Sequence, residues 1–134
     1  MARRTRKLPA VERLPWSRRL LGAFWMFAGS MHFIAPSFYE AIMPSYLPAH
    51  RELVQLSGVA EWIGGAMALS PGLKRPARWW ILGVLLAVFP ANIYVCTNPQ
   101  DIKGLDLDKI PMWALWSRLP FQGVFALWAW KATE

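Results

Sequence analysis

The sequence predicts an all-α membrane protein, a bundle of four helices that each cross the bilayer. Its composition is the first reason, because 55% of the 134 residues are hydrophobic and only 17% are charged, whereas ordinary soluble domains carry about 25% charged residues. The second reason is a series of four apolar stretches of membrane-spanning length. The third is that positive charge gathers on one set of connecting segments. Nine tryptophans also argue against a disordered chain.

The four apolar stretches are the expected transmembrane helices. Each has 16 to 20 residues, close to the roughly 20 that cross a ~30 Å hydrocarbon core at ~1.5 Å per residue. Pro90 and Pro120 fall inside the third and fourth stretches, where neighbouring helices can satisfy the carbonyls that a proline frees. Residues 20–134 are therefore expected to form one transmembrane domain. Its approximate spans are 20–35, 53–70, 77–96 and 112–130.

Residues 1–19 form a basic arm ahead of the first span. The arm contains two prolines and is too charged to pack as a core. We expect Arg18 and Arg19 to anchor the first helix at an anionic cytoplasmic leaflet. Such a run of charge is also typical of a nucleic-acid-binding tail, but no nucleic-acid partner is expected here. The basic residues of the arm are Arg3, Arg4, Arg6, Lys7, Arg13, Arg18 and Arg19.

The charges between the spans predict the orientation of the bundle. With the amino terminus inside, the inner segments carry eleven basic residues and the outer loops carry three. The positive-inside rule therefore places both termini in the cytoplasm of a multi-pass protein of the bacterial inner membrane. The outer segment 36–50 contains three prolines and three aromatic residues, and we expect it to cap the outer end of the bundle at the membrane interface. The outer loop 97–111 reads as a solvated turn.

Polar residues inside the spans mark the candidate site. An ionisable residue near the bilayer centre costs about 2.5–3.5 kcal/mol to insert, so Glu61 and Arg118 are expected to form a buried ion pair. Counted along their helices, they lie about 12 Å and 9 Å below the outer surface, and the other polar residues fall in the same half of the membrane. The expected cluster consists of Glu61, Arg118, Gln122, His32, Asn92 and Ser57.

Small residues accompany this cluster on two of the spans. Gly22 and Gly29 are seven residues apart on the first span, and Gly58 and Gly65 flank Glu61 on the second. Faces of this kind permit close contact between helices.

Three roles are open for the polar cluster. It can be a structural lock whose members satisfy one another, a polar pocket for a quinone head group, lipid head group or partner side chain, or a proton relay through Glu61 and His32. A metal site is not expected, because no second His or Cys lies at ligand spacing from His32. The single cysteine, Cys96, excludes an internal disulfide or dithiol centre. No catalytic motif is present, so no catalytic residue is assigned.

Five short motifs resemble those of the DoxX family of small four-helix bacterial membrane proteins, in its DoxX-like branch. They extend over Gly22 to Trp130 and contain the polar cluster. The motifs are G-x-x-H-F-x-x-P from Gly29, P-x-x-L-P-x-H from Pro44, S-G-x-x-E-x-x-G-G from Ser57, V-F-P-A-N-I-Y from Val88 and R-L-P-x-Q from Arg118. The resemblance implies a link to thiosulfate oxidation and quinone reduction, or a role beside thiol-handling or respiratory partners. It singles out His32, Glu61, Asn92, Arg118 and Gln122.

The functional expectation is a non-catalytic accessory or scaffold subunit of a larger membrane complex. The short chain, the absence of a reaction motif and the many tryptophans favour it. The alternative is a quinone-linked oxidoreductase subunit that binds a quinone or lipid head group near the outer leaflet. The expected partners are the lipid bilayer and other membrane-protein subunits, and a homo-oligomer is compatible with the sequence. Quinone is the one cofactor that this interpretation suggests.

Overall fold

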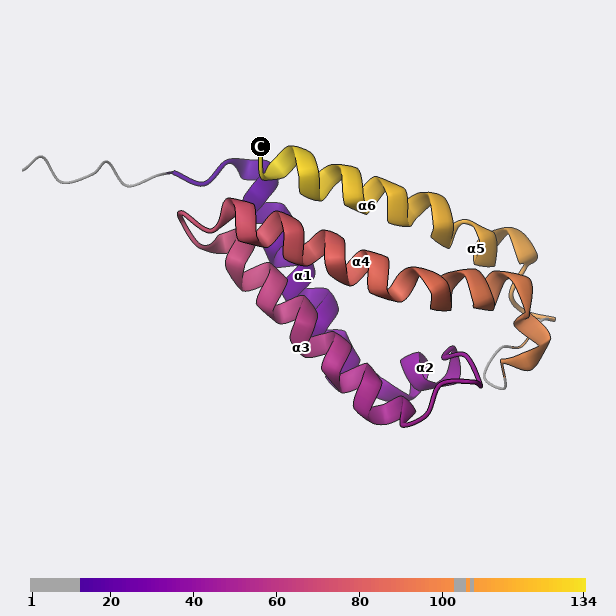
Figure 1. The fold of residues 1–134 in the computed structure, drawn as a ribbon. Coiled ribbons are helices and arrows are strands. Elements are labelled where there is room, and N and C mark those ends of the chain that lie inside the picture. Colours follow the sequence, from indigo (N-terminus) through magenta and orange to yellow (C-terminus); the bar gives the residue numbers. More distant parts are fainter. Residues whose placement is uncertain (1–12, 103–105, 107) are drawn as a thin grey trace, which may run out of the picture.

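The computed structural model describes residues 13–102, 106 and 108–134, in which every regular element is a helix (Figure 1). The all-α prediction is therefore confirmed. Residues 1–12 of the predicted basic arm, and Lys103 of the second outer loop, lie outside the described residues. In chain order the elements are α1 (Trp16–Ile34), α2 (Pro36–Ala41), α3 (His50–Leu69), α4 (Lys74–Thr97), the 3₁₀ helix η1 (Pro99–Asp101), α5 (Met112–Trp116) and α6 (Arg118–Ala132).

The long helices are arranged as two pairs that separate toward one end. Helix α1 packs along α3, and α4 packs along α6, while contact between α3 and α4 joins the pairs. Over the described residues α3 and α6 make no contact. The pairs converge where α1 begins and α6 ends, and they diverge toward α2 (Figure 1). The bundle is thus closed at one end and open at the other.

Glycines bring the backbones of α1 and α3 into contact. A Cβ atom built on Gly29 would lie 2.7 Å from the Gly58 carbonyl oxygen, and one built on Gly65 would lie 2.9 Å from the Gly22 carbonyl oxygen. Real Cβ atoms do not approach backbone oxygens this closely, so these positions require glycine. The close helix contact predicted from the small residues is confirmed.

Arg18 lies inside the closed end of the bundle. Its side chain is 1% exposed, and its Nε donates a hydrogen bond to the Ala68 carbonyl oxygen at 2.7 Å. Arg18 is therefore buried between helices, whereas the sequence reasoning expected it to anchor the first helix at the cytoplasmic leaflet. Because α1 begins at Trp16, Arg18 shares its face with the core residues Leu21 and Trp25. A cation at the carboxyl end of α3 is also favoured by the helix dipole.

The fourth predicted span is divided into two helices. Helix α5 ends at Trp116 and α6 begins at Arg118. Pro120 explains the break, because proline has no N–H to donate and its ring crowds the carbonyl four residues earlier, at Trp116. Helix α4, in contrast, continues through Pro90. The prediction that a proline can lie inside an unbroken helix is therefore confirmed for Pro90 and wrong for Pro120.

Candidate functional site

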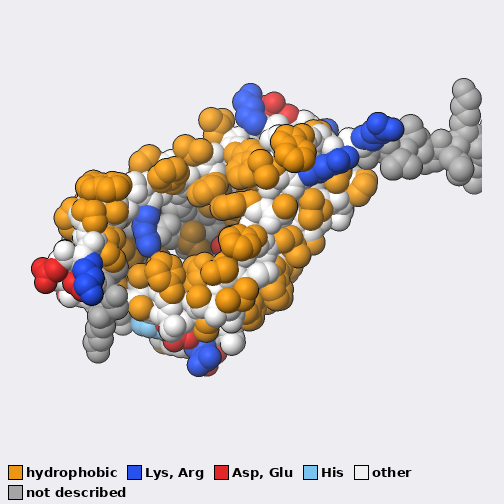
Figure 2. Space-filling model, turned by 180° about the vertical axis from the view of Figure 1, so that it is seen from behind, with side chains coloured by type: hydrophobic (Ala, Val, Ile, Leu, Met, Phe, Trp, Pro, Cys, Tyr) orange, Lys and Arg blue, Asp and Glu red, His pale blue; other side chains and the backbone are white. Residues whose placement is uncertain are grey.

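Two adjoining cavities occupy the space where the helix pairs separate. The first, the α2 cavity, has a volume of about 310 Å³ and is lined by α1, α2, α3, α4 and Arg118. The second, the α6 cavity, has a volume of about 400 Å³ and lies mainly between α1, α4 and α6. Figure 2 shows a hollow in a largely apolar face, with a basic side chain at its edge and an acidic one inside. Both volumes are in the range of small-molecule sites.

The structure places all six residues of the predicted cluster around these cavities. His32 and Ser57 line the α2 cavity, and Gln122 lines the α6 cavity. Glu61, Asn92 and Arg118 line both, so they mark the boundary between the two. The remaining walls are mostly apolar. They include Phe38, Ile42, Val54 and Val88 in the α2 cavity, and Phe24, Trp25, Phe121 and Phe125 in the α6 cavity.

Glu61 has His32 as its charged partner. Glu61 Oε2 lies 3.4 Å from His32 Nε2, and His32 Nδ1 lies 3.0 Å from the Val54 carbonyl oxygen. A carbonyl only accepts hydrogen bonds, so Nδ1 carries a proton. The imidazole therefore lies between the Val54 carbonyl oxygen, which holds its Nδ1, and the carboxyl group of Glu61.

The predicted ion pair between Glu61 and Arg118 is not formed. It is not among the ion pairs of the described residues, where His32 is the partner of Glu61. The reason lies in the packing, because α3 and α6 belong to different helix pairs and make no contact in the described structure. In contrast, Gly58 lets α1 approach so closely that a Cβ built on it would lie 2.8 Å from the His32 Cβ. Glu61 lies one turn further along α3.

Glu61 and Arg118 both have unused hydrogen-bonding capacity. Glu61 Oε2 is buried without a hydrogen-bond donor, because its contact with His32 does not have hydrogen-bond geometry. Among the described residues, nothing donates to the other Glu61 oxygen, and the Arg118 guanidinium donates to nothing. Leaving such groups unsatisfied costs about 1–3 kcal/mol each, and more when they are charged. Both side chains line the cavities, so a molecule bound there could supply the missing hydrogen-bond partners.

Asn92 and Gln122 satisfy each other. Asn92 Nδ2 donates to Gln122 Oε1 at 2.9 Å, and Gln122 Nε2 donates to the Leu85 carbonyl oxygen. These bonds connect α4 with α6 and account for the burial of Gln122. This amide pair fits the structural role considered for the cluster, whereas Glu61 and Arg118 do not.

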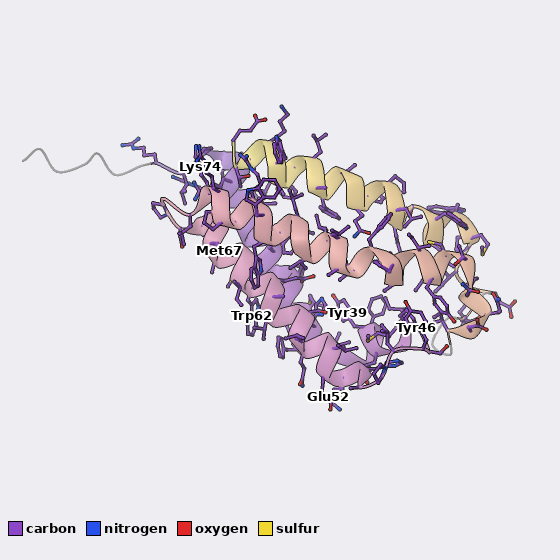
Figure 3. The ribbon with its side chains drawn as sticks, in the orientation of Figure 1. Tyr39, Tyr46, Glu52, Trp62, Met67 and Lys74 are labelled. Carbon is purple, nitrogen blue, oxygen red and sulfur yellow. The ribbon has the colours of Figure 1, made fainter. Side chains whose placement is uncertain are left out.

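Tyr39 is a site residue that the sequence reasoning did not identify. Its ring stacks on the His32 ring with the centroids 4.0 Å apart, and it lies in the opening between α3 and α4 (Figure 3). Burial, and secondly the charge of Glu61, raise the pKa of the Tyr39 phenol. The available signal was Pro36, which occupies the first turn of α2 and indicates a short helix inside the outer segment.

Comparison with known proteins gives one family. The model of a family described as "Domain of unknown function (DUF8561)" matches residues 21–133. This range includes all four long helices except the first turn of α1, and every residue that lines the two cavities. No match was found among curated proteins or among solved structures.

Proposed function

This chain belongs to the DUF8561 family, and we propose that it is a small membrane protein whose cavities bind the head group of a lipid-soluble molecule such as a quinone or a lipid. The observation that supports the proposal most is the placement of Glu61 and Arg118 at both cavities. They face one boundary between the cavities from different helix pairs, and neither has a hydrogen-bond partner among the described residues. A ligand placed between them would satisfy both.

The exposed surface supports a membrane location. Judged by length and composition, α4 is the one helix among the described residues that is long and apolar enough to cross a bilayer. Only 17% of its most apolar stretch is buried inside the protein. Large apolar side chains also face outward on the other long helices, for example Phe27, Leu56 and Leu127. Lipid would cover these side chains, whereas soluble monomers rarely expose extended apolar patches.

The proposed topology has four spans, with both termini in the cytoplasm of a bacterium. The closed end of the bundle carries Arg19, Lys74, Arg75, Arg78 and Lys131, which suits the cytoplasmic side. The α2 end would then face outward, with the cavities in the outer half of the membrane. The apolar face around the hollow in Figure 2 would give a ligand access from the lipid phase.

The binding test uses purified protein in mild detergent and a short-tailed quinone. Quenching of tryptophan fluorescence reports binding, since Trp25 lines the α6 cavity. Ala28→Phe, which fills that cavity from α1, should weaken binding at least about tenfold. Ala23→Phe, on an exposed position of the same helix, should leave it unchanged. If no quinone or phospholipid binds saturably, or if the two variants behave alike, the proposed function is wrong.

A second proposal is that the protein is an accessory subunit of a larger membrane complex. It is motivated by tryptophans that project from the bundle, including Trp16, Trp79 and Trp113. Such side chains can pack on lipid or on another protein. Purification in mild detergent should recover a stoichiometric partner, and isolation as a lone monomer would count against this role. The resemblance to the DoxX family stays a prediction, to be tested by comparing the structures.

A further inference from the structure

We infer that the cavities select head groups that donate a hydroxyl hydrogen bond to Glu61 and offer a second oxygen atom to Arg118. For a quinone-type ligand, this means the reduced dihydroxy form rather than the dicarbonyl form. The inference rests on the proposed function and goes beyond it by specifying the hydrogen-bonding chemistry of the ligand.

Glu61 is the acidic partner in the contact with His32. A carboxylate has only acceptors, so both of its oxygens can accept hydrogen bonds. Oε2 is inaccessible, yet the Glu61 side chain is 20% exposed and lines both cavities. The remaining carboxyl oxygen is thus the atom available to a ligand.

Asn92 contributes a second acceptor beside Glu61. Its Nδ2 is used by Gln122, and no described residue donates to its Oδ1. Both Glu61 and Asn92 line both cavities. A ligand hydroxyl that approaches this wall can therefore donate to Asn92 Oδ1 as well as to Glu61, while the second Asn92 Nδ2 hydrogen is a donor for another ligand oxygen.

Arg118 has the opposite chemistry. The guanidinium carries only donors, and it makes no hydrogen bond or ion pair with any described residue. A ligand oxygen with a free lone pair, neutral or anionic, suits it best. The site therefore requires a donor on one side of the head group and an acceptor on the other.

These requirements divide lipid-soluble ligands into two groups. A dihydroxyarene can donate one hydroxyl to Glu61 while its second oxygen accepts from Arg118. The corresponding quinone has only carbonyl acceptors, so one of them would face the Glu61 oxygen without a proton between them. A phosphoglycerol head group has the same pattern as the dihydroxyarene, a hydroxyl and a phosphate oxygen, whereas phosphocholine has no donor.

The test compares two matched pairs of ligands on the full chain in detergent. The first pair is decylubiquinol and decylubiquinone, measured without oxygen, and the second is short-chain phosphatidylglycerol and phosphatidylcholine. In at least one pair, the member with hydroxyl donors should bind at least about tenfold more tightly. The pair that shows this preference identifies the source of the ligand.

Glu61→Gln tests the residue that the inference assigns. The amide has a donor as well as an acceptor, so the preference should fall below about threefold, through tighter binding of the donor-free member. Glu52→Gln is the matched control, because Glu52 lies on the same helix at an exposed position outside the cavities (Figure 3), and it should keep the full preference. A thermal melt shows whether Glu61→Gln is folded.

The outcomes separate this inference from the proposed function. If both members of a pair bind the unmodified protein equally well and neither pair shows a preference, the inference is wrong while ligand binding stands. Tighter binding of the donor-free members would also overturn it. If none of the four ligands binds, the proposed function and the inference are both wrong. The comparison on the unmodified protein holds even if Glu61→Gln does not fold.

Discussion

At the residue scale, the contact between His32 and Glu61 sets how Glu61 lies beside the cavities. It directs one carboxyl oxygen toward the imidazole and leaves the other facing the cavity. The Val54 carbonyl fixes the ring by holding Nδ1, and Tyr39 covers one face of it. A carboxyl group that would be costly to bury alone thus has a neighbour that carries the opposite charge when it is protonated.

A double-mutant cycle should show which partner Glu61 has. We expect His32→Ala and Glu61→Ala to be coupled by about 1–3 kcal/mol in the free energy of unfolding, because each change leaves the other group without its partner. The cycle of Glu61→Ala with Arg118→Ala should show coupling below about 0.5 kcal/mol. Denaturant titrations in detergent would measure both values. Stronger coupling to Arg118 than to His32 would contradict the structure.

The Tyr39 phenol should report the charge of Glu61. Its pKa lies above the ordinary value of 10.0 because of burial first and the Glu61 charge second. Glu61→Gln should therefore lower this pKa without restoring the ordinary value. A raised pKa stabilises the folded protein below pH 10, and that contribution is lost as the pH rises through the higher value. Ultraviolet absorbance would follow the titration, with Tyr39→Phe identifying its phase. If the pKa of Tyr39 is unchanged in Glu61→Gln, the Glu61 charge does not act on the Tyr39 phenol.

At the scale of elements, the two helix pairs are held together differently. Helices α1 and α3 meet through glycines with backbone near backbone. Helices α4 and α6 are joined near the site by the amide pair of Asn92 and Gln122. The glycine contact leaves little room for adjustment, because close-packed backbone cannot move aside as a flexible side chain can. It fixes the position of His32 relative to Glu61.

Alanine substitutions should distinguish the packed glycines from the free ones. Gly29→Ala should lower the free energy of unfolding by about 1–3 kcal/mol, because its Cβ would collide with the Gly58 carbonyl. Gly83→Ala on α4 meets nothing within 4 Å and should be neutral or stabilise by up to about 1 kcal/mol through helix propensity. Thermal melts in one detergent would compare them. Equal effects would mean that α1 and α3 are not in backbone contact.

At the scale of the whole molecule, the divergence of the helix pairs creates the site. The closed end is filled by a core of Leu21, Trp25, Ala68, Ile81 and Ala129, and the open end contains the cavities. The described chain begins and ends near the closed end (Figure 1). In a membrane, this arrangement would put the basic residues on one side and the cavities toward the other.

Fusion reporters should reveal the proposed topology. Alkaline phosphatase fused after Asp101, in the segment between α4 and α5, should be active because it would reach the periplasm. The same enzyme fused after Gly72 or after Glu134 should be inactive, since the positive-inside rule keeps these sites in the cytoplasm. A fluorescent protein fused after Glu134 should be bright. The opposite pattern would mean that the bundle has the opposite orientation in the membrane. Activity at all three sites would mean that the chain does not span the membrane.

The sequence by itself determined that the chain is helical, where its four long apolar stretches lie, and most of the polar residues that line the cavities, although not Tyr39. Apolar stretches of about 20 residues set the four long helices, and polar groups within them are costly enough to be found by inspection. Only the tertiary structure decided which of them touch. Packing decides whether two helices that can each place a charge at the same depth actually meet. Here glycines draw α1 to α3, whereas α6 contacts α1 and α4 and, over the described residues, does not contact α3. Hence Glu61 contacts His32, and Arg118 remains across the cavity.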